Sequence, residues 1–134
     1  MLYSLHHGEN LLAMDSSGVP TYAQPFRMGG LAPRKKVAVL DAVATGGPKA
    51  VFFHVINRHF DTPMEVQVDL TDLAPLGTKA RHYILQGRLT DPPAPGQPAQ
   101  IAEITDSQVT FDGKMLKLTL PARSVSCVEI PRNR

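Results

Sequence analysis

The sequence predicts an all-β fold, an antiparallel sandwich of two sheets, and three observations support this prediction. Twelve Pro and ten Gly among 134 residues provide frequent turns. Apolar and polar residues alternate in several short runs, and no helical period extends over a useful length. The length suits one domain with an ordinary core, whereas a complete (β/α)₈ barrel needs about 200 residues or more. We therefore expect a single jelly-roll-like sandwich that needs no disulfide or metal for stability.

Five strands are expected in the first half of the chain, at residues 10–15, 19–28, 36–45, 49–58 and 64–70. Two prolines make the second an edge strand or an extended loop, because proline cannot donate to a β-ladder. The third and fourth are β-branched runs joined by Gly46-Gly47-Pro48, which predicts a hairpin. Both faces of the fourth run are apolar, as in the central strand of a buried sheet. The fifth alternates cleanly, so one face is expected to point inward and the other to water.

The second half predicts strands at residues 78–90, 107–111, 114–120 and 124–130. Four prolines between residues 91 and 98 predict an extended surface loop. The Asp112-Gly113 pair predicts a second hairpin, between residues 107–111 and 114–120. In the last strand the single cysteine, Cys127, alternates with serine and valine. One cysteine cannot form an internal disulfide, and this pattern favours a packed structural thiol over a nucleophile.

Charge and hydropathy restrict the expected partners. Fourteen basic and twelve acidic residues leave a net charge of +2, too little to indicate nucleic acid. The one basic cluster, Arg34-Lys35-Lys36, is expected to be a solvated strand edge or loop. The first eight residues lack the basic leader and apolar core of a secretory signal, and no apolar run could span a bilayer. We therefore expect a soluble, cytoplasmic chain with neither a nucleic acid nor a membrane partner.

The beginning of the chain is unusual for a sandwich. Leu2-Tyr3-Ser4-Leu5 followed by His-His-Gly predicts a short helical turn at the N-terminus that ends at Gly8. We accordingly interpret residues 1–8 as the remnant of a preceding helix and residues 9–134 as the β-sandwich domain. A domain that starts on the last turn of a helix is expected to have been cut from a larger protein.

The residues that could carry chemistry do not form a recognisable catalytic or metal-binding motif. Most acids fall in turns or on outward strand faces, and Asp41, which interrupts an apolar strand, is also expected to face solvent. Chelation by His54, His59 and His82 would need a favourable alignment of strands. We expect no catalytic residue, no cofactor and no metal.

The most promising polar group is Asn57-Arg58-His59, at the end of the central strand. Its side chains could contact a sugar or a neighbouring domain. The alternative is that they satisfy the carbonyl groups of nearby turns, which is the commoner use of such residues.

Several runs resemble the C-terminal β-sandwich domain of α-L-arabinofuranosidases of glycoside hydrolase family 51. The resemblance lies in the order of the runs at residues 37–45, 51–58 and 64–70, and in the closing run at residues 118–130, where Leu-Pro is followed by Ser-Val. Residues 2–8 are similar to the end of the last barrel helix that precedes that domain. One departure is Ala38, where the family often has proline.

The resemblance implies a non-catalytic accessory domain that packs on and stabilises a (β/α)₈ barrel. The parent enzyme would be a retaining glycosidase that removes terminal α-L-arabinofuranosyl groups. None of the motifs around its two catalytic glutamates is present, so no catalytic residue carries over. Leu2, Tyr3 and Leu5 are the expected barrel-facing apolar contacts, and exposure of that patch would promote self-association. The alternatives are an independent carbohydrate-binding module, for which aromatic residues are few, and a structural interaction module.

Overall fold

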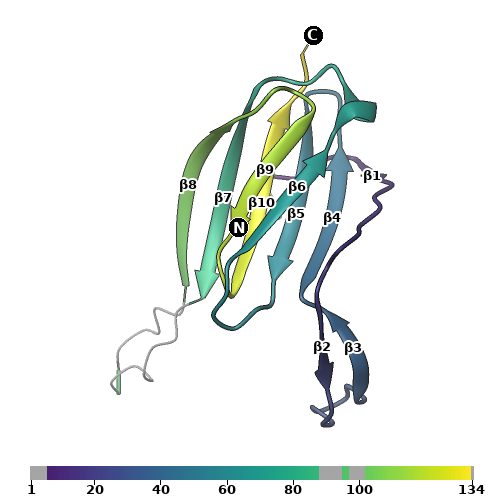
Figure 1. Ribbon diagram of the computed structural model, residues 1–134. Helices are drawn as coiled ribbons and strands as arrows, with labels where there is room; N and C mark the ends of the chain where they lie inside the picture. The colour runs from purple at the N-terminus through teal and green to yellow at the C-terminus, as the bar shows by residue number, and fades with distance from the viewer. Residues whose placement is uncertain (1–5, 88–94, 97–101, 134) are drawn as a thin grey trace.

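A computed structural model describes residues 6–87, 95–96 and 102–133, and its strands run antiparallel (Figure 1). The elements in chain order are β1 (Asn10–Leu12), β2 (Thr21–Gln24), β3 (Arg34–Ala38), β4 (Leu40–Gly46), β5 (Ala50–Asn57), β6 (Met64–Asp69), the 3₁₀ turn η1 (Thr71–Leu73), β7 (Lys79–Gly87), β8 (Ala102–Thr110), β9 (Met115–Leu120) and β10 (Ser124–Pro131). The predicted all-β fold is confirmed.

The strands form one large sheet and two small ones. The large sheet has the order β1-β4-β5-β10-β7-β8, so the central strands β5 and β10 come from opposite halves of the chain. Strands β6 and β9 pair with each other and lie across one face of the large sheet (Figure 1). Strands β2 and β3 form a separate hairpin that projects beyond the ends of β4 and β5. The molecule is therefore a two-layer sandwich with one protruding hairpin.

The core fills the space between the large sheet and the β6–β9 pair. We call the face of the large sheet that contributes to this core the inner face, and the opposite face the outer face. The inner face provides Val51, Phe53, Val55, Ala80, Val128 and Ile130, and the second layer provides Leu116, Leu118 and Leu120. Strand β9 alternates between buried leucines and exposed residues along its whole length, as expected for a strand with one face in water.

We expected one continuous strand at residues 36–45. The structure instead divides this run between two strands that belong to different sheets. The break falls at Val39, which is buried. Its N–H donates to Pro20 O and its carbonyl accepts from Arg58 N, both at 2.9 Å. These two bonds redirect the chain from β3 into β4. The expected hairpin about Gly46-Gly47-Pro48 is confirmed, since β4 and β5 are paired.

The Asp112-Gly113 turn does not close a hairpin, and that prediction was wrong. Strand β8 pairs with β7 in the large sheet, whereas β9 pairs with β6 in the second layer. The Asp112 carboxylate accepts bonds from the N–H groups of Lys114 and Met115, and Gly113 has a φ of 83°. These residues do form the expected turn, but the turn connects a strand of the large sheet to a strand of the second layer.

The helical turn that was expected to end at Gly8 is not present at residues 6–8. In the described residues the helical turn is η1. Gly8 meets a packing requirement instead, because a Cβ there would lie 2.4 Å from the carbonyl carbon of Gly46. Its N–H donates to Thr45 Oγ1 at 2.9 Å. Residues 1–5 and most of the proline-rich loop at 91–98 lie outside the described residues.

Strands β5, β6, β9 and β10 lie within one residue of their expected bounds, whereas β8 begins at Ala102, five residues before the expected residue 107, and β1 and β2 are shorter than expected. Alternation at residues 64–70 and 124–130 predicted β6 and β10, and the basic cluster at residues 34–36 lies on exposed strand β3, as expected. In the part of the chain that the structure describes, no helix is long and apolar enough to cross a membrane.

Candidate functional site

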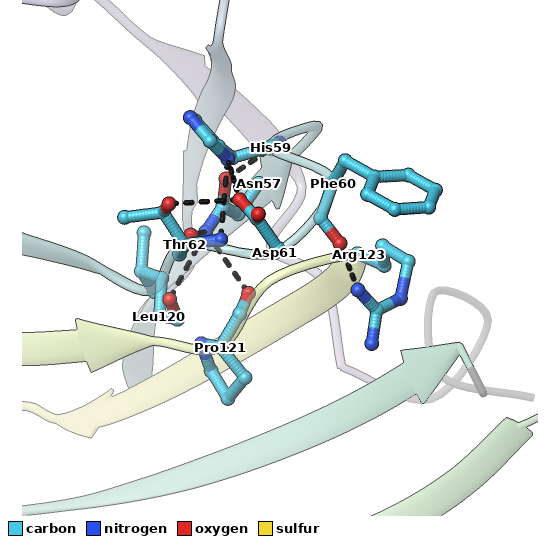
Figure 2. Close-up of polar contacts among 8 residues, drawn as sticks. All are labelled: Asn57, His59, Phe60, Asp61, Thr62, Leu120, Pro121 and Arg123. Carbon is cyan, nitrogen blue, oxygen red and sulfur yellow. Dashed lines mark hydrogen bonds and ion pairs between the residues drawn. The ribbon is translucent and has the colours of Figure 1, made fainter. Parts of the chain in front are cut away.

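Asn57, the last residue of β5, lies inside the molecule, where it joins two loops (Figure 2). Its side chain is 1% exposed. The amide Nδ2 lies 3.0 Å from Leu120 O, 3.0 Å from Pro121 O and 3.2 Å from Thr62 O, and Oδ1 accepts from His59 N at 2.9 Å. Asn57 thus links the end of β5 to the bend between β9 and β10.

Arg58 and His59 lie nearer the surface and also make internal contacts. Arg58 donates to Ala38 O at 3.0 Å and lies 2.5 Å from the Asp41 carboxylate. Nδ1 of His59 accepts from Thr62 N at 3.1 Å, which requires that nitrogen to be unprotonated. The Asp61 carboxylate, 3.2 Å from the same nitrogen, is then not its hydrogen-bond acceptor. A sugar or interdomain contact by these residues stays a prediction.

Arg123, in the bend between β9 and β10, also contacts the loop that follows β5. Its φ of 53° is left-handed, its N–H donates to His59 O, and its guanidinium donates to Phe60 O. The guanidinium carbon lies 5.7 Å from the centre of the Phe60 ring, which is largely exposed. Figure 2 shows that ring at the edge of the cluster, pointing away from Asn57. The cluster presents one aromatic surface with a cation beside it.

The outer face of the large sheet is the second candidate. Strand register places these apolar side chains on it: Val43, Phe52, Ile56, Tyr83, Leu85, Ile104 and Val125. Val43 and Ile104 are exposed, and the other five are only partly buried. A half-covered apolar sheet face of this kind is typical of an interaction surface.

The first described residues of the chain run over this face. The ring of His6 stacks on Tyr83 with centroids 4.2 Å apart, and its Nδ1 lies 3.4 Å from the Glu129 carboxylate. The thiol of Cys127 approaches His6 O at 3.7 Å. Residues 2, 3 and 5, the predicted barrel contacts, lie outside the described residues, but the residue that follows them lies on the outer face.

Burial under this segment alters two ionisable groups. Burial raises the pKa of the Cys127 thiol to about 12, with a smaller contribution from Glu129. Burial lowers the pKa of His54, which lies beside Cys127 in the strand register. Cys127 is therefore a protonated, inert thiol at neutral pH, in agreement with the expected structural role.

The described residues offer little support for acid-base catalysis or for metal binding. Every described aspartate is exposed and Glu129 is half-buried, whereas a general acid needs burial to hold its proton at neutral pH. Asp41 faces solvent, as expected. His54 lies on the outer face and His82 on the inner face, so the sheet separates two of the three histidines considered for chelation. Within the described ranges, no group of three metal-binding side chains was found.

The described residues define an all-β, two-layer sandwich whose apolar outer face is only partly covered. No family model matches the chain, and no curated protein matches it significantly. Solved structures do match. A thermostable GH51 α-L-arabinofuranosidase from Thermotoga petrophila RKU-1 is 22% identical over 96% of this chain and 27% of its own, with a TM-score of 0.74.

Two further structures show how far the fold extends. The arabinose complex of the α-L-arabinofuranosidase from Thermotoga maritima is 22% identical and covers 94% of this chain and 26% of its own, with a TM-score of 0.72. CelM2, a bifunctional glucanase-xylanase from a metagenome library, is 23% identical over 73% of this chain and 18% of its own, with a TM-score of 0.55. The chain therefore spans about a quarter of the two arabinofuranosidase chains and has the fold of that part.

Sequence reasoning noticed one sign of the outer face and missed the rest. The apolar character of both faces of residues 49–58 indicated that β5 would be covered on both sides. The contact of His6 with Tyr83 and Glu129 could not be predicted, because it joins residues far apart in the chain.

Proposed function

We propose that this chain is a non-catalytic accessory domain of an α-L-arabinofuranosidase-like glycoside hydrolase. It packs on the catalytic (β/α)₈ barrel of that enzyme and stabilises it. The observation that carries the proposal is the match over 96% of this chain and 27% of the length of a GH51 α-L-arabinofuranosidase. The parent activity would be hydrolysis of terminal α-L-arabinofuranosides, in the cytoplasm.

The outer face of the large sheet supports this proposal physically. A sheet whose inner face already has a hydrophobic core gains nothing from apolar side chains on the other side unless another surface covers them. The segment that enters the domain runs over this face through His6. A preceding domain would therefore lie next to the surface that it has to cover.

An independent carbohydrate-binding module is the second candidate, favoured by one observation. The exposed Phe60 ring with the Arg123 guanidinium beside it could stack on a sugar. Titration with arabinan or xylan tests this function directly. Saturable binding that Phe60→Ala removes would favour the module over the accessory domain.

The DNA upstream of Met1 provides the first test of the accessory domain. We expect an in-frame (β/α)₈ barrel with two catalytic glutamates, and its absence would contradict the proposal. The 134-residue chain alone should not hydrolyse 4-nitrophenyl α-L-arabinofuranoside, whereas the longer polypeptide should.

A substitution on the outer face tests the packing. In the longer polypeptide, Ile104→Glu should lower the melting temperature of the barrel and its activity, because a carboxylate would be buried without a partner. The matched control is Thr119→Glu, which lies on the exposed face of β9. Equal effects of the two variants would argue against packing through the outer face.

A further inference from the structure

We propose that the hairpin of β2 and β3 is a dimerisation arm that docks on strand β1 of a second copy of this chain. The arm comprises residues 21–38 and forms a two-stranded sheet of its own (Figure 1). The docking surface, which we call the root, comprises β1 and its flanking residues, 9–15. The proposal does not depend on the proposed function, because the arm and the root are distinct from the centre of the outer face.

The arm presents apolar side chains to solvent on a preformed turn. Phe26, Met28 and Leu31 are 76%, 63% and 61% exposed. Met28 and Leu31 exchange two backbone hydrogen bonds of 3.2 and 3.0 Å, and Gly29 between them has a φ of 58°. Because the turn is already hydrogen-bonded, little conformational entropy is lost when these side chains are covered. An ordered apolar tip that contributes nothing to its own core is suited to an interface.

Exposed apolar residues gather in the first third of the chain. Of the ten large hydrophobic side chains that are exposed in the described residues, seven lie between residues 11 and 43: Leu11, Met14, Tyr22, Phe26, Met28, Leu31 and Val43. Four belong to the arm and two, Leu11 and Met14, to the root. Two apolar surfaces of this kind on one chain allow a reciprocal contact in which each copy provides both.

Charge distinguishes the arm from the root. The arm carries Arg27 and the cluster at residues 34–36, and no acidic residue occurs between residues 16 and 40. The root carries Glu9 and Asp15, which are both exposed, and no basic residue occurs between residues 8 and 26. Neither acid forms an ion pair with another described residue. Two arms would repel each other, whereas an arm on a root places opposite charges together.

The arm cannot easily fold back on its own root. Val39 N donates to Pro20 O, and Arg58 donates to Ala38 O, so both strands are held at the base of the arm. The arm then extends away from the end of the sandwich, while β1 lies higher along the edge of the large sheet (Figure 1). Strand β1 has β4 on one side only, which leaves the other edge open. A two-fold axis between arm and root would place each arm on the root of the partner copy.

Sedimentation equilibrium of the 134-residue chain tests the proposal. We expect a reversible dimer. Phe26→Ser combined with Met28→Ser should raise the dissociation constant of the dimer about tenfold or more, because the change removes two central apolar contacts. The matched control is Phe60→Ser combined with Met115→Ser, which removes two exposed apolar side chains outside the arm, the root and the outer face and should leave the dimer unchanged. All four positions are exposed, so folding should be preserved, and circular dichroism checks this.

Charge reversal provides the second measurement. Lys35→Glu with Lys36→Glu should weaken the dimer, Glu9→Lys with Asp15→Lys should weaken it as well, and the four changes together should restore it. A chain that is monomeric at all concentrations would overturn the proposal, as would a dimer that is insensitive to the arm or not restored by the combined reversal. Binding of a monomeric chain to phosphatidylserine vesicles through the arm would also overturn it. Loss of barrel stability on Ile104→Glu would be a separate result, which bears only on the proposed function.

Discussion

Asn57 illustrates how one buried amide can connect segments that are far apart in the sequence. Strand β5, the loop at residues 59–62 and the bend after β9 all meet at its side chain. Both amide hydrogens and the amide oxygen find backbone partners, so the residue satisfies groups that would otherwise be buried without hydrogen bonds. The residue type at this position matters for stability whether or not a sugar or another domain contacts the loop.

Replacing Asn57 with alanine should destabilise the fold by about 1–3 kcal/mol, because the carbonyl groups of Leu120 and Pro121 would lose a buried donor. The free energy of unfolding in urea measures this loss. Arg58→Ala is the control at the neighbouring position. It removes an exposed ion pair, which should cost about 1 kcal/mol or less. If the two variants lost the same stability, the assigned role of Asn57 would be wrong.

Cys127 should be unreactive in the folded protein. Its pKa of about 12 leaves roughly one thiol in ten thousand ionised at pH 8, and the side chain is fully buried. Ellman's reagent should therefore modify no thiol in the native chain and one thiol per chain in urea. Rapid modification of the native protein would mean that the segment at His6 does not cover the thiol.

Strand β9 shows that a period of two in the sequence corresponds to a real division between core and solvent. Leu116→Ala should cost about 2–5 kcal/mol, because a fully buried leucine would leave a cavity between the layers. Lys117→Ala, at the next position on the opposite face, should change stability by about 0.5 kcal/mol or less. Urea unfolding of the two variants tests the register directly, since a shift of one residue would exchange their effects.

Patterns local to one strand predicted the elements better than patterns that concern their neighbours. Alternation placed β6 and β10, and the Asp112-Gly113 turn placed β9, close to their observed bounds. The same signals could not show that Val39 divides one apolar run between two sheets, because the dividing bonds come from Pro20 and Arg58. Nor could the Asp112-Gly113 pair show whether its two strands would pair, since the same turn residues serve a hairpin and a crossing between layers.

At the scale of the whole molecule, stability should fall as the solution is made more acidic. Burial lowers the pKa values of His54 and His82 below the ordinary value of about 6.5. The unfolded chain therefore binds more protons than the folded chain below about pH 6.5, so stability is lost as the pH decreases. The carboxyl groups of Asp69 and Asp112, whose pKa values are lowered by hydrogen bonds, add a further loss below about pH 4.

Thermal melting at about pH 7.5 and pH 5.5 measures the histidine contribution. The melting temperature should be lower at the acidic pH. His82→Gln should reduce the difference, because glutamine can retain the hydrogen bond to the Ser126 hydroxyl, which is 3.0 Å long, but cannot be protonated. A wild-type melting temperature that does not change between the two pH values would contradict the assigned burial.

The sequence by itself determined the fold class, the positions of most strands and the face that each alternating strand turns to the core. These properties follow from turn residues and a two-residue period, which act within a few positions of the chain. Only the tertiary structure decided which strands pair, that Gly8 crosses Gly46, that Asn57 faces inward, and that an apolar outer face and a basic arm remain available. Each of these depends on contacts between distant residues, because alternation specifies the face of a strand but not its neighbour.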